Sequence, residues 1–123
     1  PFRSKAILPL GNEPEPTRLL LQWVEWNMKQ RWLGADGHDY MTGLSKVTVP
    51  AAVVAGGRDI VAPAAGCKAI YDAIGSSDKL WILCAQSHGF STDLAHAQLI
   101  RGTVAHTEVF PKLVAWLQDH VVC

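Results

Sequence analysis

The sequence predicts an α/β fold built on a parallel sheet, and three observations support this prediction. Two short apolar runs, residues 49–56 and 79–85, have the length and composition of buried strands. The stretch between them, residues 63–75, has the apolar spacing of a helix. A strand, a helix and a second strand in that order form a βαβ unit, in which the two strands run parallel.

The amino-terminal part, residues 1–46, is expected to form a lid or cap segment. Repeated prolines break regular structure in the first 16 residues, so that part is expected to be extended. Apolar residues then recur at helical spacing from Thr17 to about Gly34, and three of them are tryptophans. Such a helix buries a large area, either against a core or as the roof of an apolar pocket. A second, short helix is expected over residues 39–44.

Residues 47–123 are expected to form a carboxyl-terminal βαβα part of the core. The helix over residues 63–75 begins at a proline and stops at a glycine, as helices commonly do. After the second strand, residues 86–103 are predicted to form a loop. The final helix is predicted over residues 107–120, where apolar residues recur at helical spacing and Pro111 lies near the first turn.

Two parallel strands alone would leave both edges of the sheet unpaired. Small sheets generally need three or more strands for stability, and strands as apolar as residues 49–56 usually pair with a neighbouring strand on each side. The sequence therefore predicts the carboxyl-terminal portion of a larger parallel sheet, with covering helices and a helical lid segment.

Composition and charge narrow the classes of function. Eleven basic and eleven acidic residues balance without a Lys/Arg stripe, so neither nucleic acid nor an anionic membrane is expected as a partner. No apolar run approaches the roughly 20 residues that span a bilayer, so a soluble, cytoplasmic protein is expected. Cys67, Cys84 and Cys123 are widely spaced, which favours buried thiols over a disulfide framework or a metal site.

Asp59 follows the first strand, at the end of the sheet where parallel α/β proteins place their chemistry. The pattern from Pro50 to Pro63, Pro-x-x-x-x-x-Gly-x-x-Asp-x-x-x-Pro, resembles the penultimate-strand acid motif of the α/β-hydrolases. A helix, a strand, a histidine-bearing loop and a terminal helix follow in the order of that family. The resemblance covers residues 47–120, and residues 11–40 resemble the family's cap insertion.

The resemblance implies a catalytic triad of which this chain holds a part. In the family, a Ser in a Gly-x-Ser-x-Gly elbow attacks an acyl carbon, a His takes the Ser proton, and the acid orients the His. The acid would be Asp59, and the Ser would precede it. Ser4 and Ser45 lack the flanking glycines of an elbow. The expected partner is therefore an amino-terminal half of the same hydrolase, carrying the nucleophile and the oxyanion hole.

Two histidines compete for the role of base. His88, shortly after the second strand, stands where the commonest hydrolase pattern places it. Residues 89–100, which contain His96, together with residues 101–102 and 108–111, are similar to the Asp-Tyr-Gly-His-x-Asp-Leu-Leu segment of acid-lipase-like and related bacterial hydrolases. This second match extends over more residues, so His96 is favoured. Two residues depart from that segment, with Ala95 in place of Gly and Gln98 in place of Asp.

Simpler roles are open to the same residue types. An Asp after a strand commonly caps the following turn or helix, and Asp59 precedes the predicted helix by a few residues. His38, His106 and His120 lie in a turn or on a helix, with no ligand spacing, so exposed or capping roles are expected for them.

The expected function is that of a serine hydrolase, esterase- or lipase-like, acting on a small apolar acyl ester with Asp59 and His96 as the acid and base of the triad. No metal or organic cofactor is expected, because Cys84, His88 and His96 do not form a zinc pattern. The alternative is a non-catalytic hydrolase-like fragment or subunit that pairs with an amino-terminal half. An Asp or Cys nucleophile on the same fold would instead support dehalogenation or polyester synthesis.

Overall fold

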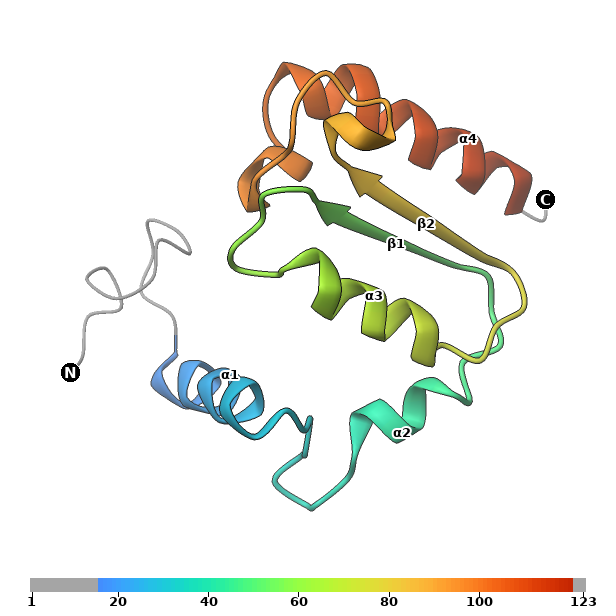
Figure 1. Ribbon diagram of the computed structural model, residues 1–123. Coiled ribbons are helices and arrows are strands. Elements are labelled where there is room, and N and C mark those ends of the chain that lie inside the picture. The colour runs from blue at the N-terminus through green and yellow to red at the C-terminus, as the bar shows by residue number, and fades with distance from the viewer. Residues whose placement is uncertain (1–15, 121–123) are drawn as a thin grey trace. The chain divides into compact units, whose positions relative to one another are not determined.

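The computed structural model describes residues 16–120, which divide into two compact units. One unit comprises the described residues up to Met41, and the other begins at Thr42. The described chain is a small α/β structure with four α-helices and a two-stranded parallel sheet packed against helices (Figure 1). Of the predicted extended segment, residues 1–16, all but Pro16 lie outside the described residues. Cys123 also lies outside them.

The first unit is built on helix α1 (Thr17–Lys29). The helix ends earlier than predicted, because Gln30 adopts the left-handed conformation (φ 51°, ψ 36°) and its N–H donates to the carbonyl of Trp26. The Trp26 indole N–H donates to the carbonyl of Leu33 at 2.8 Å, and its ring stacks on Trp32 with centroids 5.8 Å apart. The chain after α1 is therefore held against the helix by one tryptophan.

The predicted βαβ unit is confirmed in the second unit. Strands β1 (Ala51–Gly56) and β2 (Lys79–Cys84) pair in parallel, and helix α3 (Ala64–Ala73) connects them. Their arrows point the same way in Figure 1, with α3 on one side of the sheet and α4 (Phe110–His120) on the other. The short helix α2 (Tyr40–Leu44), also predicted, precedes β1.

Alternation along β2 explains how the two helices cover the sheet, because successive side chains of a strand point to opposite faces. Ile82 and Cys84 belong to the buried core cluster on the α4 side. Trp81, which directly precedes Ile82 and points to the opposite face, contacts Tyr71 of α3 with ring centroids 5.7 Å apart. The rest of that core cluster is supplied by the loop after β2 and by the last helical segment, through Phe90, Leu94 and Val109.

The segment after β2 is more ordered than predicted. The expected loop contains two short 3-10 turns, η2 (Gln86–His88) and η3 (His96–Leu99). The last helical segment contains a π-helical turn, η4 (Ala105–Val109), and continues as α4. A proline ring crowds the carbonyl four residues before it, and the wider π turn fits that constraint at Pro111.

β1 is less covered than a central strand would be. Its first four residues, 51–54, are half-buried, and β2 is its only strand neighbour within residues 16–120. None of the described helices has the length and apolar character that a membrane crossing requires. The larger sheet expected from the sequence stays a prediction.

Candidate active site

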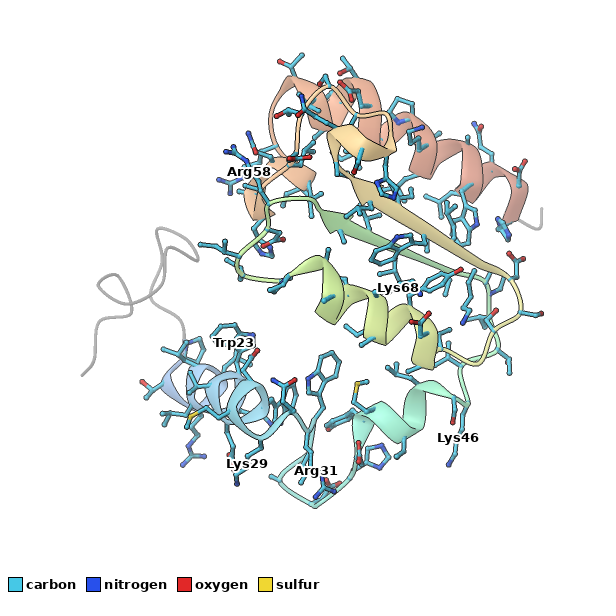
Figure 2. The ribbon with its side chains drawn as sticks, in the orientation of Figure 1. Trp23, Lys29, Arg31, Lys46, Arg58 and Lys68 are labelled. Carbon is cyan, nitrogen blue, oxygen red and sulfur yellow. The ribbon has the colours of Figure 1, made fainter. Side chains whose placement is uncertain are left out.

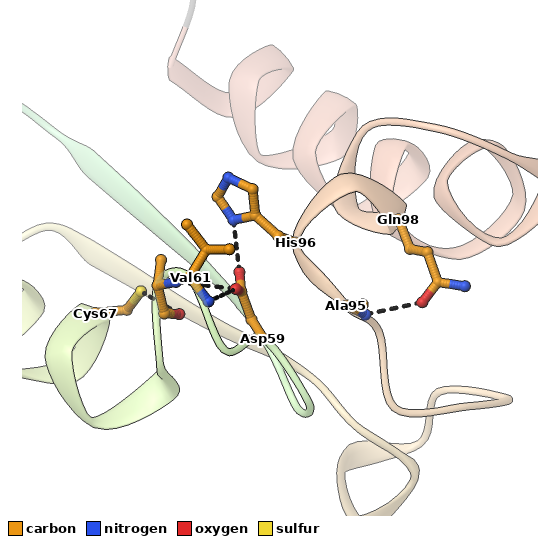
Figure 3. A network of polar contacts seen from close by, with 7 residues as sticks. Asp59, Val61, Cys67, Ala95, His96 and Gln98 are labelled. Carbon is orange, nitrogen blue, oxygen red and sulfur yellow. Dashed lines mark hydrogen bonds and ion pairs between the residues drawn. The ribbon is translucent and has the colours of Figure 1, made fainter. Parts of the chain in front are cut away.

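Asp59 lies three residues beyond the end of β1, with its side chain 1% exposed. One carboxylate oxygen, Oδ1, accepts the backbone N–H groups of Val61 (2.8 Å) and Ala62 (2.9 Å). The other, Oδ2, lies 2.8 Å from Nδ1 of His96. Figure 3 shows the carboxylate between these two sets of donors. The backbone of the turn thus fixes one oxygen and leaves the second directed at the imidazole.

These contacts keep Asp59 ionised. Burial alone would raise the pKa of its carboxyl group, but hydrogen bonds from the Ala62 N–H, from His96 and from the Val61 N–H together lower that pKa below its ordinary value. The lowering is physically reasonable, since each donor favours the charged form of the acceptor. A buried carboxylate in contact with a ring nitrogen can orient the imidazole and stabilise the imidazolium.

His96 begins the 3-10 turn η3 and presents its ring at the surface, 51% exposed. Because Nδ1 faces an ionised carboxylate, the neutral ring carries its proton on Nδ1 and leaves Nε2 as an acceptor. No residue in the described range hydrogen-bonds Nε2. The free nitrogen is therefore open to a proton donor from outside the described chain.

The backbone holds the two loops together at Leu94, which is fully buried. Its carbonyl accepts the N–H of Arg58 at 3.1 Å, and its N–H donates to the carbonyl of Cys84 at 3.0 Å. Gly56 makes this approach possible, because a Cβ on that residue would lie 2.4 Å from the Leu94 carbonyl oxygen. The histidine loop thus packs directly on the carboxyl ends of both strands.

Gln98 adds a side-chain link between the same loops. Its Oε1 accepts the N–H of Ala95 at 2.8 Å and an N–H of the Arg58 guanidinium (Nη2) at 3.1 Å. Figure 2 labels Arg58 at the end of β1, and Figure 3 shows the bond from Ala95 to Gln98. From sequence, Gln98 was visible only as a departure from the hydrolase segment. Its partners are 40 and 3 residues away, a combination that sequence spacing does not reveal.

His88, the competing candidate base, lies elsewhere in the loop. It is exposed in η2, and its Nδ1 is 3.0 Å from the hydroxyl of the adjacent Ser87. No hydrogen bond joins it to Asp59 within the described residues. The structure thus brings Asp59 together with His96 and not with His88. A catalytic role for the pair stays a prediction.

The other histidines have local contacts. His120 lies 2.6 Å from the Trp116 carbonyl through Nδ1 and 2.9 Å from Asp78 through Nε2, and these bonds, the one to Trp116 first, raise its pKa. The ring of His106 meets Phe110 edge-on at 4.9 Å. His38 packs in the same way on a tyrosine. All three lie in turns or on helices, as the sequence indicated.

Burial raises the pKa of the Cys84 thiol to about 11, so this side chain keeps its proton at neutral pH. Cys67, on α3, is also a free thiol with a raised pKa, for which burial and then the charge of Asp59 are responsible. Among the residues the structure describes, no group of three His, Cys, Asp or Glu side chains is placed to hold a metal ion.

Comparisons with known proteins give no assignment. No family model matches the chain, and neither the curated proteins nor the solved structures include a match. Any assignment of function therefore depends on the motif and on the geometry of Asp59 and His96.

Proposed function

We propose that this chain is the carboxyl-terminal part of a serine hydrolase that acts on small apolar acyl esters, and that Asp59 and His96 are the acid and base of its triad. One observation supports this most. The two side chains are hydrogen-bonded at 2.8 Å at the carboxyl ends of parallel strands, with the other ring nitrogen exposed. The same arrangement orients the base in Ser-His-Asp catalysis.

In this proposal each proton has a defined path. The serine hydroxyl gives its proton to Nε2 of His96 as its oxygen bonds to the acyl carbon. The Nδ1 proton stays on the ring, donated to Oδ2 of Asp59. His96 then returns the Nε2 proton to the departing alcohol, and a water molecule repeats the sequence to release the acid. Asp59 stays ionised throughout.

An amino-terminal half is proposed to supply the nucleophile and the oxyanion hole. Within residues 16–120, no serine, threonine or cysteine side chain hydrogen-bonds His96. The open Nε2 and the half-buried β1 both fit a site completed by further chain. Ile60, next to Asp59, is 86% exposed, which is consistent with an apolar acyl group or partner surface there.

The proposal is tested in the complete protein with a short-chain p-nitrophenyl ester as substrate. Asp59→Asn and His96→Ala are each expected to lower kcat by about 10³–10⁴-fold, because triad members act as a unit. Matched controls are Asp72→Asn, an exposed acid paired with Lys68 on α3, and His88→Ala. Both controls are expected to keep the wild-type rate.

Other results would redirect the assignment. If His88→Ala abolishes turnover while His96→Ala does not, His88 is the base. If neither Asp59→Asn nor His96→Ala changes turnover, the triad assignment is wrong. The non-catalytic alternative predicts a different result. A scaffold subunit would hydrolyse no ester, and the complete protein would not react with a fluorophosphonate probe.

A further inference from the structure

In addition to the backbone bonds at Leu94, one side-chain oxygen links the loops that carry Asp59 and His96. Oε1 of Gln98 accepts two hydrogen bonds, one from the backbone N–H of Ala95 and one from the guanidinium of Arg58. Each donor residue is the immediate neighbour of a member of the pair, because Arg58 precedes Asp59 and Ala95 precedes His96. Gln98 therefore connects the two residues at the point where each leaves its loop.

The Ala95 bond bears directly on the imidazole. Ala95 is extended (φ −86°, ψ 169°), and His96 follows it as the first residue of the 3-10 turn. The 2.8 Å bond from its N–H to Oε1 of Gln98 closes this turn together with the backbone bond from the Gln98 N–H to the Ala95 carbonyl at 2.9 Å, and the His96 ring leaves the backbone within this turn. The ring itself is half exposed and is hydrogen-bonded to Asp59 through one atom pair, so its position depends on the backbone that carries it.

The Arg58 bond supplies the link across the loops. The Arg58 backbone N–H is already held by the Leu94 carbonyl at 3.1 Å, so its backbone is fixed before its side chain reaches Gln98. A shift of the histidine loop relative to Asp59 would have to break the backbone bond, the guanidinium bond, or both.

We propose that Gln98 is a positioning residue that holds the His96 ring against Asp59. The expected effect of Gln98 on turnover rests on the proposed hydrolase function, whereas its effect on the hydrogen bond between His96 and Asp59 does not. Gln98 touches neither substrate nor ring and acts through the backbone of Ala95 and through Arg58.

The amide is suited to this task because it accepts two hydrogen bonds without adding charge. Asp59 is the one carboxylate bonded to His96 in the described chain, and Arg58 is the cation bonded to Gln98. A carboxylate at position 98 would keep both bonds and place a second negative charge near the ring. A comparison of glutamine with glutamate at position 98 therefore separates the effect of the hydrogen bonds on His96 from the effect of charge.

Three variants of the complete protein test the proposal. Gln98→Met has similar length and no oxygen, Gln98→Glu keeps the acceptor and adds charge, and Gln86→Met is the matched control. Gln86 lies in the same loop, and its side chain donates within that loop to the carbonyl of Ser91 at 3.2 Å. Activity is measured as kcat, KM and the pH profile of kcat/KM.

Gln98→Met is expected to lower kcat about tenfold with KM unchanged, because the base is misplaced and substrate binding is not. Gln98→Glu is expected to keep kcat within about twofold of the wild-type value. The added negative charge is expected to move the acid limb of the kcat/KM profile up by about half a pH unit. Gln86→Met is expected to match the wild type. A merely structural role for Gln98 would move neither the kcat to KM ratio nor the profile.

A readout independent of turnover is the NMR signal of the Nδ1 proton of His96, which lies far downfield when it is donated to a carboxylate. This signal is expected in the wild type and in Gln98→Glu, and is expected to broaden or disappear in Gln98→Met. If Gln98→Met folds poorly, Gln98→Glu decides the question through its signal and its pH profile.

The results separate this inference from the proposed function. An unchanged signal and unchanged kcat in Gln98→Met, together with loss of turnover in Asp59→Asn, would overturn the positioning role and leave the hydrolase assignment standing. Loss of the signal in Gln98→Met with no effect of Asp59→Asn on turnover would support the geometry and refute the hydrolase assignment.

Discussion

At the scale of single residues, Asp59 performs two tasks with its two oxygens. Oδ1 accepts the N–H groups of Val61 and Ala62 and so closes the turn after β1, while Oδ2 accepts the proton on Nδ1 of His96. Capping a turn and orienting a histidine had been alternatives for this residue. The structure combines them, because a carboxylate has lone pairs enough for both.

Because the pKa of Asp59 is lowered in the folded state, its contribution to stability depends on pH. The unfolded chain takes up the proton near pH 3.9, above the folded value, so the stabilisation is fully present well above that pH and is lost as the pH falls through the lower, folded pKa. Asn at this position keeps the shape and one acceptor and does not titrate.

We therefore expect the free energy of unfolding of the complete protein to fall less steeply between about pH 5 and pH 2.5 in Asp59→Asn than in the wild type. Urea denaturation at several pH values measures this difference. Asp72→Asn is the control, because this acid is exposed and paired only with Lys68 on the surface of α3. Parallel curves for Asp59→Asn and the wild type would show that Asp59 has no such role.

The same scale shows what sequence reasoning missed. Asp59 and His96 were predictable because each belongs to a local pattern that resembles a known motif. Gln98 was visible only as a mismatch, since its side chain is bonded to Arg58, 40 residues away. A long-range side-chain contact leaves no periodic or spacing signal in one sequence.

At the scale of elements, the existence and order of helices and strands followed the hydrophobic pattern, and most of their ends lie within two residues of those predicted, whereas the end of α1 does not. Helix α1 stops at Lys29 because Trp26 binds the returning chain through its indole and its carbonyl. The π turn at Ala105–Val109 accommodates the ring of Pro111, and it buries Ala105 and Val109. Such ends depend on tertiary contacts, which override local propensity.

Two glycines near α3 give opposite predictions for the same substitution. A Cβ on Gly75 would lie 1.9 Å from the carbonyl oxygen of Ser45, whereas a Cβ on Gly66 would meet nothing within 4 Å. We expect Gly75→Ala to lower the free energy of unfolding by about 1–3 kcal/mol through overpacking.

Gly66→Ala is expected to raise the free energy of unfolding by about 0.5–1 kcal/mol, because alanine loses less backbone entropy than glycine when the helix forms. Thermal or urea unfolding of the complete protein measures both. Equal effects of the two substitutions would contradict the close approach of α3's carboxyl end to Ser45.

At the scale of the whole molecule, the described sheet has fewer strands than the apolar character of its strands would predict. β1 pairs with β2 alone in the described part of the chain, and residues 51–54 are only half-buried although all are apolar. Strands of this kind are normally covered on both faces and paired on both edges.

We therefore expect this 123-residue chain, expressed by itself, to aggregate or to fold poorly, and to become soluble when co-expressed with the proposed amino-terminal half. Size-exclusion chromatography and thermal melting of both preparations measure this. A monomeric product that melts cooperatively without a partner would refute the expectation of a larger sheet.

The sequence by itself determined the α/β class, the parallel βαβ unit and the candidate residues Asp59, His88 and His96, because these depend on hydrophobic period and on local motifs. Only the tertiary structure decided that Asp59 meets His96 and not His88, since the loop of His96 packs through Leu94 on the strand ends and is bonded through Gln98 to Arg58. Both contacts join residues far apart in the chain, and the energy of such contacts exists only once the fold has brought the residues together.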